Sequence, residues 1–195
     1  MYTPFFRKGG RCFRASPAFN IKPDKKRRFD NSLIISVRLC PFNHAQVIIC
    51  KALSKKLRPF PTTFWLTCPH LIKLAGTVES QGGVHELEEY LKNKNLFHEW
   101  HRYNFLHQVI RLNLIEKNLK AFMKKYRSKI FRGLIRGGIG GIKYGEDLKI
   151  INVKCLHLQV ASCLGLGFHP GKEWLEAKGL CSDCGRGLCS IINKK

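Results

Sequence analysis

Residues 33–69 read LIISVRLCPFNHAQVIICKALSKKLRPFPTTFWLTCP. β-branched and apolar residues fill 33–39 and 45–53, which is typical of strands, and the residues between them, CPFNH at 40–44, are typical of a turn. These two runs predict a β-hairpin. A third extended run, 61–67, follows a basic linker. Together the three runs predict a small antiparallel sheet of about three strands in the N-terminal half of the chain.

The pattern changes from strand to helix at Cys68 and Pro69. Proline is favoured in the first turn of a helix, where its missing N–H needs no partner. Apolar residues at helical spacing follow, and Gly82 with Gly83 ends the segment. Further helices are predicted over about 84–91, 96–130 and 152–164, and a last short turn of helix over 170–178. The chain is therefore predicted to have an α+β fold in which the sheet packs with about four helices.

The longest predicted helix, about 96–130, has an apolar stripe that we expect to face the core. Lys and Arg occupy its other face, and the glycine-rich stretch 133–145 follows as a flexible break. The stripe consists of Trp100, Phe105, Val109, Leu112, Ile115, Leu119 and Phe122.

The chain is strongly basic. It has 35 Lys and Arg against 13 Asp and Glu among 195 residues, a formal net charge of +22, and the first 60 residues hold 14 of the basic and 2 of the acidic side chains. Such a field attracts phosphates, so RNA or another polyanion is a candidate partner. The alternative is that the basic surface only keeps the protein in solution. At 44% hydrophobic residues the chain has enough apolar material for one folded core.

We divide the chain into three parts. Residues 1–30 are basic and without periodicity, and we interpret them as a disordered tail, a transit peptide or a start-site extension. Residues 31–178 form a single α+β domain, and 179–195 form a Cys-rich C-terminal tail. There is no secretory signal and no run of 18 uncharged apolar residues. We therefore expect a cytoplasmic protein with reduced cysteines and no transmembrane segment.

Four residues are candidates for a metal site: Cys40 in the hairpin turn, Cys68 at the strand-to-helix junction, and Cys155 and His157 in VKCLH at 153–157. Three thiolates and one imidazole form the ligand set of a closed zinc site, and three thiolates alone could hold an iron–sulfur cluster. Cys155 and His157 are two residues apart, so they share a site only if the helix begins near Cys155. His157 is alternatively a hydrogen-bond partner of the ligands.

The C-terminal tail carries a second, more compact thiol set. Cys181, Cys184 and Cys189 have the spacing C-x2-C-x4-C, which suits chelation. His169 or Cys163 is a candidate fourth ligand for a possible second metal site. The alternative is a mobile tail with incidental cysteines.

Two other classes of function compete with metal binding. In a cysteine-dependent enzyme, Cys68 or Cys155 would be a thiolate nucleophile activated by His157 or His70. We rank this below metal binding, because the sequence identifies no carboxylate or amide that would orient the histidine.

In the other class, the protein is a basic RNA- or DNA-binding module with structural cysteines. Trp65, Trp100 and Tyr103 would then supply surfaces on which bases stack.

Five features follow one another along the chain: Arg38 with Cys40 before the hairpin turn, PFPTTFWLTCP at 59–69, LIK at 71–73, GIGGI at 138–142 and VKCLH at 153–157. In this combination the chain resembles the bacterial domain of unknown function 501 family over about residues 33–178. The resemblance implies that Cys40, Cys68, Cys155 and His157 are characteristic positions, which favours their meeting in space. It implies no particular activity.

Overall fold

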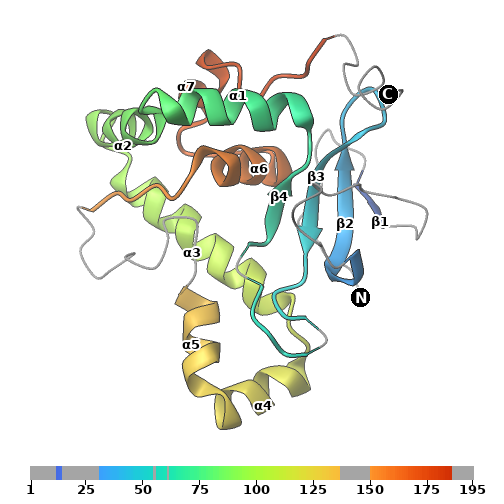
Figure 1. Cartoon of the computed structure of the whole chain (residues 1–195). Coiled ribbons are helices and arrows are strands. Elements are labelled where there is room, and N and C mark those ends of the chain that lie inside the picture. Colours follow the sequence, from blue (N-terminus) through green and yellow to red (C-terminus); the bar gives the residue numbers. More distant parts are fainter. Residues whose placement is uncertain (1–11, 15–30, 55, 61, 137–149, 186–195) are drawn as a thin grey trace.

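The structure is a computed structural model that describes residues 12–14, 31–54, 56–60, 62–136 and 150–185. A small antiparallel sheet from the N-terminal half packs against helices from the rest of the chain (Figure 1). The predicted α+β class is therefore confirmed. Most of the basic segment 1–30 and of the glycine-rich stretch 133–145 lies outside the described residues.

The sheet has the strand order β1-β2-β3-β4, and all neighbouring strands are antiparallel. The predicted hairpin is formed by β2 and β3, where Val37 pairs with Ile48, and Ile48 pairs in turn with Trp65. A fourth strand, β1, lies within the segment that we interpreted as a tail. The strands are β1 (Cys12–Arg14), β2 (Ile34–Leu39), β3 (Ala45–Cys50) and β4 (Phe64–Leu66), and a 3-10 turn, η1 (Asn31–Leu33), precedes β2.

The described residues form seven α-helices, more than the four or so predicted. They are α1 (Pro69–Ser80), α2 (Gly83–Asn93), α3 (Phe97–Asn113), α4 (Lys117–Tyr126), α5 (Ser128–Arg136), α6 (Leu156–Leu166) and α7 (Lys172–Ala177). As predicted, α1 begins at Pro69, directly after Cys68.

The prediction of one long helix over about 96–130 is wrong. The helix ends at Asn113, and Glu116 has an extended backbone (ψ 145°) that starts α4 in a new direction. A second break at Arg127 separates α4 from α5. The chain turns because the apolar side chains of this region pack on one another in a small cluster of their own. Its buried members are Ala52, Leu53, Ile115, Met123 and Leu134.

The main core lies between the sheet and helices α1, α2, α3 and α6. Helix α6 approaches the sheet closely at Gly165, where an added Cβ would lie 2.4 Å from the ring of Phe64 in β4. Leu180, beyond α7, is fully buried in the same core, so the packed body extends past residue 178. No helix in the described part of the chain is long and apolar enough to cross a membrane.

Candidate functional site

The VKCLH segment leads directly into α6. Cys155 is the N-cap residue, with an extended backbone (φ −162°, ψ 152°), and the helix begins at Leu156. Just before it, the backbone N–H of Val153 donates to Glu88 Oε1 of α2 at 2.8 Å. Cys155 and His157 could share a site only if a helix begins near Cys155, and the structure has a helix start at this point.

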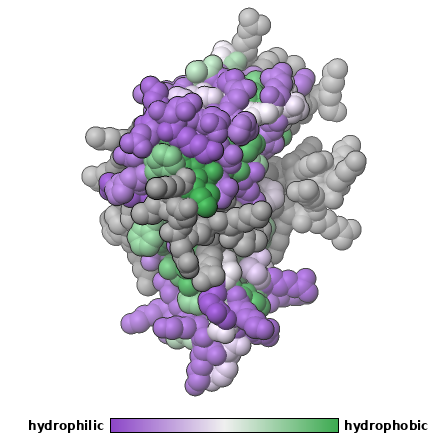
Figure 2. Space-filling view, turned by 90° about the vertical axis from the view of Figure 1, so that its left-hand side faces the viewer, coloured by the Kyte–Doolittle hydropathy of each residue, from purple (hydrophilic) through white to green (hydrophobic). Residues whose placement is uncertain are grey.

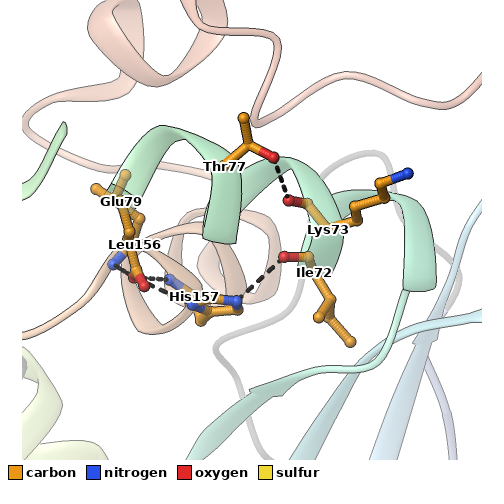
Figure 3. Close-up of polar contacts among 6 residues, drawn as sticks. All are labelled: Ile72, Lys73, Thr77, Glu79, Leu156 and His157. Atoms are coloured by element: carbon orange, nitrogen blue, oxygen red, sulfur yellow. Dashed lines mark hydrogen bonds and ion pairs between the residues drawn. The ribbon is translucent and has the colours of Figure 1, made fainter. Parts of the chain in front are cut away.

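Glu79 of α1 ties that helix to the start of α6 (Figure 3). Its Oε1 accepts hydrogen bonds from the backbone N–H groups of Leu156 at 2.5 Å and of His157 at 3.3 Å, and it lies 3.0 Å from Nδ1 of the His157 ring. A carboxylate at a helix N-terminus satisfies N–H groups that have no partner within the helix. On the other side of the ring, Nε2 lies 3.1 Å from the carbonyl oxygen of Ile72. We call these four residues the α1–α6 clasp.

The clasp occupies both nitrogens of His157. Each lies within hydrogen-bonding distance of an oxygen acceptor, and a ring nitrogen that donates to its acceptor offers no lone pair to a metal ion or to a thiol proton. Glu79 is the orienting carboxylate that the sequence did not identify. Nε2, however, faces the carbonyl oxygen of Ile72 in α1 rather than a thiol, so His157 is not positioned as the base of a nucleophilic cysteine.

The structure does not gather the candidate metal ligands. Cys68 precedes the first turn of α1, whereas Cys155 lies beside Glu79. Eleven residues of helix, at a rise of about 1.5 Å each, separate Cys68 from Glu79 by about 16 Å. Cys40 lies in the β2–β3 turn. Among the described residues, no group of three or more Cys, His, Asp or Glu side chains could hold a metal ion. The zinc and iron–sulfur assignments stay predictions without support from this geometry.

Burial raises the pKa of the Cys155 thiol, and the backbone N–H groups of Leu158 and His157 oppose that effect. Burial also raises the pKa of Cys50 in β3 to about 12. A high pKa keeps a thiol protonated and unreactive at neutral pH. The cysteine-dependent enzyme therefore gains no support at Cys155.

The second predicted thiol set lies partly outside the described residues, because Cys189 is not among them. Cys181 meets Cys163 of α6, one of the two candidate fourth ligands, with their Sγ atoms 3.2 Å apart. His169 is held elsewhere by Gln159.

The largest feature that the sequence analysis missed is a polar seam buried between α3 and α6. The side of α3 that faces the interior carries polar groups at helical spacing, and two of the apolar residues assigned to the core, Phe105 and Phe122, are exposed. The expected apolar stripe is therefore wrong in part. The buried polar residues of α3 are His101, Asn104, His107 and Arg111.

One part of the seam joins three side chains. Ser162 Oγ of α6 lies 2.6 Å from His107 Nε2 and forms a second, very short contact with the Tyr103 hydroxyl. Tyr103 also donates to the carbonyl oxygen of Phe168 at 3.1 Å. Burial raises the pKa of Tyr103, and burial together with the charge of Arg111 lowers the pKa of His107 to about 3.

The other part of the seam fixes His169 as a neutral ring. Its Nε2 lies 3.0 Å from Gln159 Oε1 and donates to it, while Nδ1 accepts the backbone N–H of Gly171 at 2.9 Å. Burial, with a smaller effect of His107, lowers the pKa of His169 to about 3. His107 and His169 are therefore neutral at physiological pH, and apart from the charged Arg111 they belong to a network of paired neutral groups with Tyr103, Gln159 and Ser162.

The seam positions helices rather than substrates. Ser162 and Gln159 are fully buried, and each joins α6 to a histidine of another segment. Buried polar networks whose members are all paired favour one arrangement of the elements that they join. The sequence did hold a signal, because His101, Asn104, His107 and Arg111 recur at intervals of three and four residues.

A second feature is the basic hairpin, which we define as residues 117–136, that is α4, α5 and the turn between them. From 117 to 132 it has seven Lys and Arg and no Asp or Glu. Six of the seven are exposed: Lys117, Lys124, Lys125, Arg127, Lys129 and Arg132. The hairpin lies at one end of the molecule, below the sheet and the helices of the main core (Figure 1).

Aromatic side chains accompany the charges of the basic hairpin. Tyr126 is 61% exposed and Phe122 is 42% exposed; they are four residues apart on α4, with ring centroids at 5.1 Å. The Lys125 ammonium lies 5.1 Å from the centre of the Tyr126 ring. By contrast, Trp100 and Tyr103 are buried, so the prediction that they supply stacking surfaces is wrong.

These features define an α+β protein whose helices are joined by a carboxylate–histidine clasp and a buried polar seam. The chain belongs to the family described as Protein of unknown function (DUF501), whose model matches residues 36–177. The predicted family resemblance is confirmed over nearly the range expected. No curated protein and no solved structure matches the chain.

Proposed function

We propose that this protein binds single-stranded nucleic acid, RNA in particular, through the basic hairpin. The observation that carries the proposal is the joint exposure of cations and aromatic rings on α4, with Lys124, Lys125, Phe122 and Tyr126 all open to solvent. Proteins that bind single strands without a strong sequence preference combine a basic surface for phosphates with aromatic faces for bases.

Buried side chains hold the basic hairpin in place, and they are separate from its exposed cations and rings. Met123 and Leu134 are buried in its own apolar cluster, and Arg111 of the seam donates to the carbonyl oxygen of Leu134 at 3.3 Å. In the space-filling view the corresponding lower part of the molecule is mostly hydrophilic, with apolar patches between the polar side chains (Figure 2). The binding groups can therefore be altered without touching the residues that hold the hairpin in place.

The cations of the hairpin are expected to set the salt dependence of binding. We expect Lys124→Gln with Lys125→Gln to weaken binding of a labelled single-stranded RNA, because two phosphate contacts are lost. The slope of log K against log salt should become shallower by about 1.4, at about 0.7 for each contact on a single strand. Fluorescence anisotropy over a salt series measures both quantities.

The matched control removes the same charge elsewhere. Lys94→Gln with Lys154→Gln changes two exposed lysines outside the hairpin. It should leave the slope near the wild-type value. If both double variants change the slope equally, RNA responds only to net charge, and the hairpin is not the binding surface.

Stacking is tested separately from charge. Tyr126→Ala should weaken RNA binding by about 1–3 kcal/mol, the value of one base stacked on an aromatic ring, while Tyr126→Phe should retain most of it. Inorganic polyphosphate, which has no bases, should bind Tyr126→Ala as tightly as the wild type. The control Phe42→Ala removes an exposed aromatic ring from the β2–β3 turn. Equal losses for RNA and polyphosphate would contradict stacking and leave a general polyanion site.

A further inference from the structure

We propose that Cys163 and Cys181 form a thiol–disulfide exchange site whose substrate class is a low-molecular-weight disulfide. Their Sγ atoms lie 3.2 Å apart, and both residues are free thiols in the structure. A disulfide bond requires about 2.05 Å between the sulfurs, so little more than 1 Å of movement separates the two states.

The pair joins two parts of the chain that are 18 residues apart in sequence. Cys163 is in the last turns of α6, whereas Cys181 follows α7 and the fully buried Leu180. The next residues are held as well, because Gln46 Nε2 of β3 donates to Asp183 Oδ1 at 3.3 Å. These contacts on either side keep the Cys181 sulfur beside its partner.

The groups around the pair favour the thiolate of Cys163 over that of Cys181. The Cys181 thiol donates to Cys163 Sγ, which lowers the pKa of Cys163 and raises that of Cys181. The positive charges of Lys172 and Arg38 further favour the Cys163 thiolate, against the effects of burial and of Glu176. The pair therefore loses its first proton more readily than its second, and proton exchange across the contact can place the thiolate on either sulfur.

The difference in exposure between the two cysteines decides which of them reacts first. Cys163 is 3% exposed, whereas Cys181 is only partly buried and can meet a small molecule. The Cys181 thiolate attacks one sulfur of the disulfide RSSR, forms a mixed disulfide and releases RS⁻. Cys163 then attacks the Cys181 sulfur, forms the internal disulfide and releases the second RS⁻. The two thiols lose two electrons, RSSR gains them, and the two thiol protons leave with two molecules of RSH.

The test uses the full chain, fully reduced, and oxidised glutathione as the disulfide. After exposure and alkylation, intact mass should show the loss of two reactive thiols without retained glutathione. Peptide mapping without reduction should find Cys163 linked to Cys181. Cys184→Ser is the matched control, since it removes the neighbouring thiol of the C-x2-C motif and should form the same link.

Removal of the second thiol should stop the reaction halfway. Cys163→Ser should accumulate glutathione on Cys181, because the thiol that resolves the mixed disulfide is missing. If Cys163→Ser does not fold, peptide mapping of the wild-type chain still tests the proposal. A Cys181–Cys184 link in the wild type, stable glutathione on Cys181, or no loss of thiols would each overturn the proposal.

Discussion

Acidification from about pH 7.5 to about pH 5 is expected to lower the free energy of unfolding by about 4 kcal/mol through His107 and His169 alone. Both rings are buried, and burial lowers the pKa of each from 6.5 to about 3. Between these two values the unfolded chain binds a proton at each histidine and the folded chain does not. One pKa unit corresponds to about 1.4 kcal/mol, so each ring accounts for about 2 kcal/mol at pH 5.

Stability is lost on acidification because both rings are neutral in the folded state. A base whose pKa is lower in the folded protein contributes its full stability above the unfolded pKa of 6.5, and that stability is lost as the pH falls toward 3. Domains of this size are stable by about 5–15 kcal/mol, so the loss is a large part of the total. Chemical denaturation at a series of pH values measures it.

Substitution of each histidine by glutamine removes the titrating group but keeps a side chain that can form hydrogen bonds. His169→Gln can still donate to Gln159 and accept from Gly171, and His107→Gln can still contact Ser162. Each substitution should reduce the slope of unfolding free energy between pH 6 and pH 4 by about 1.4 kcal/mol per pH unit, and the double variant by about twice that. A double variant that keeps the wild-type slope would show that the acid sensitivity arises elsewhere.

The sheet and α1 could be predicted from sequence because their signals are local. Alternating β-branched residues on either side of CPFNH specify the hairpin, and Pro69 marks the start of α1 whatever lies around it. The end of α6 was misplaced by only two residues, while its start at Leu156 depends on a carboxylate from another helix.

Helix α3 shows why the rest could not be predicted. The usual inference from periodicity assigns the apolar face to the core, yet Phe105 is 64% exposed while Asn104 is fully buried. A polar face can be buried only if another segment supplies partners. His107 is paired with Ser162, 55 residues further along the chain, and Arg111 with the carbonyl oxygen of Leu134 in α5. Nothing in the sequence of α3 itself shows that they will be there.

The role of His157 in the candidate site likewise depends on a residue that is far away in the sequence. The sequence predicted a helix over about 152–164 that includes Cys155 and His157, whereas the helix begins at Leu156. The partner that determines what His157 does is Glu79, which is 78 residues away. The sequence favoured a metal or a nucleophile because thiols with an imidazole suit both kinds of chemistry. In the structure both ring nitrogens have oxygen partners, which favours a role in joining α1 to α6.

If the clasp has that role, Glu79→Ala should lower the free energy of unfolding by about 3 kcal/mol. The substitution removes the acceptor of two backbone N–H groups and of the His157 ring, and Leu156, whose N–H would lose its partner, is fully buried. A buried donor left unpaired costs about 1–3 kcal/mol, and loss of a helix cap costs about 0.5–2 kcal/mol. Glu79→Gln keeps an oxygen acceptor and should cost about 1 kcal/mol. Urea unfolding measures both.

The matched control is Glu86→Ala in α2. Glu86 forms an ion pair with Lys178 at 2.6 Å, but the side chains are 46% and 37% exposed, and exposed pairs contribute little. Its loss should change the free energy of unfolding by less than about 1 kcal/mol. If Glu79→Ala is no more harmful than this control, the clasp does not stabilise the fold, and His157 becomes available again for catalysis or for a metal.

A double-mutant cycle with His157→Ala divides the effect of Glu79 between its two kinds of partner. If Glu79 acts mainly as the cap of α6, Glu79→Ala should cost nearly as much in the His157→Ala background as in the wild type, since the backbone donors remain. If it acts mainly through the ring, most of the cost should disappear in that background. The presence of two backbone donors against one ring donor favours the first outcome. In that case the histidine of VKCLH adds a second, weaker link between α1 and α6, through the carbonyl group of Ile72.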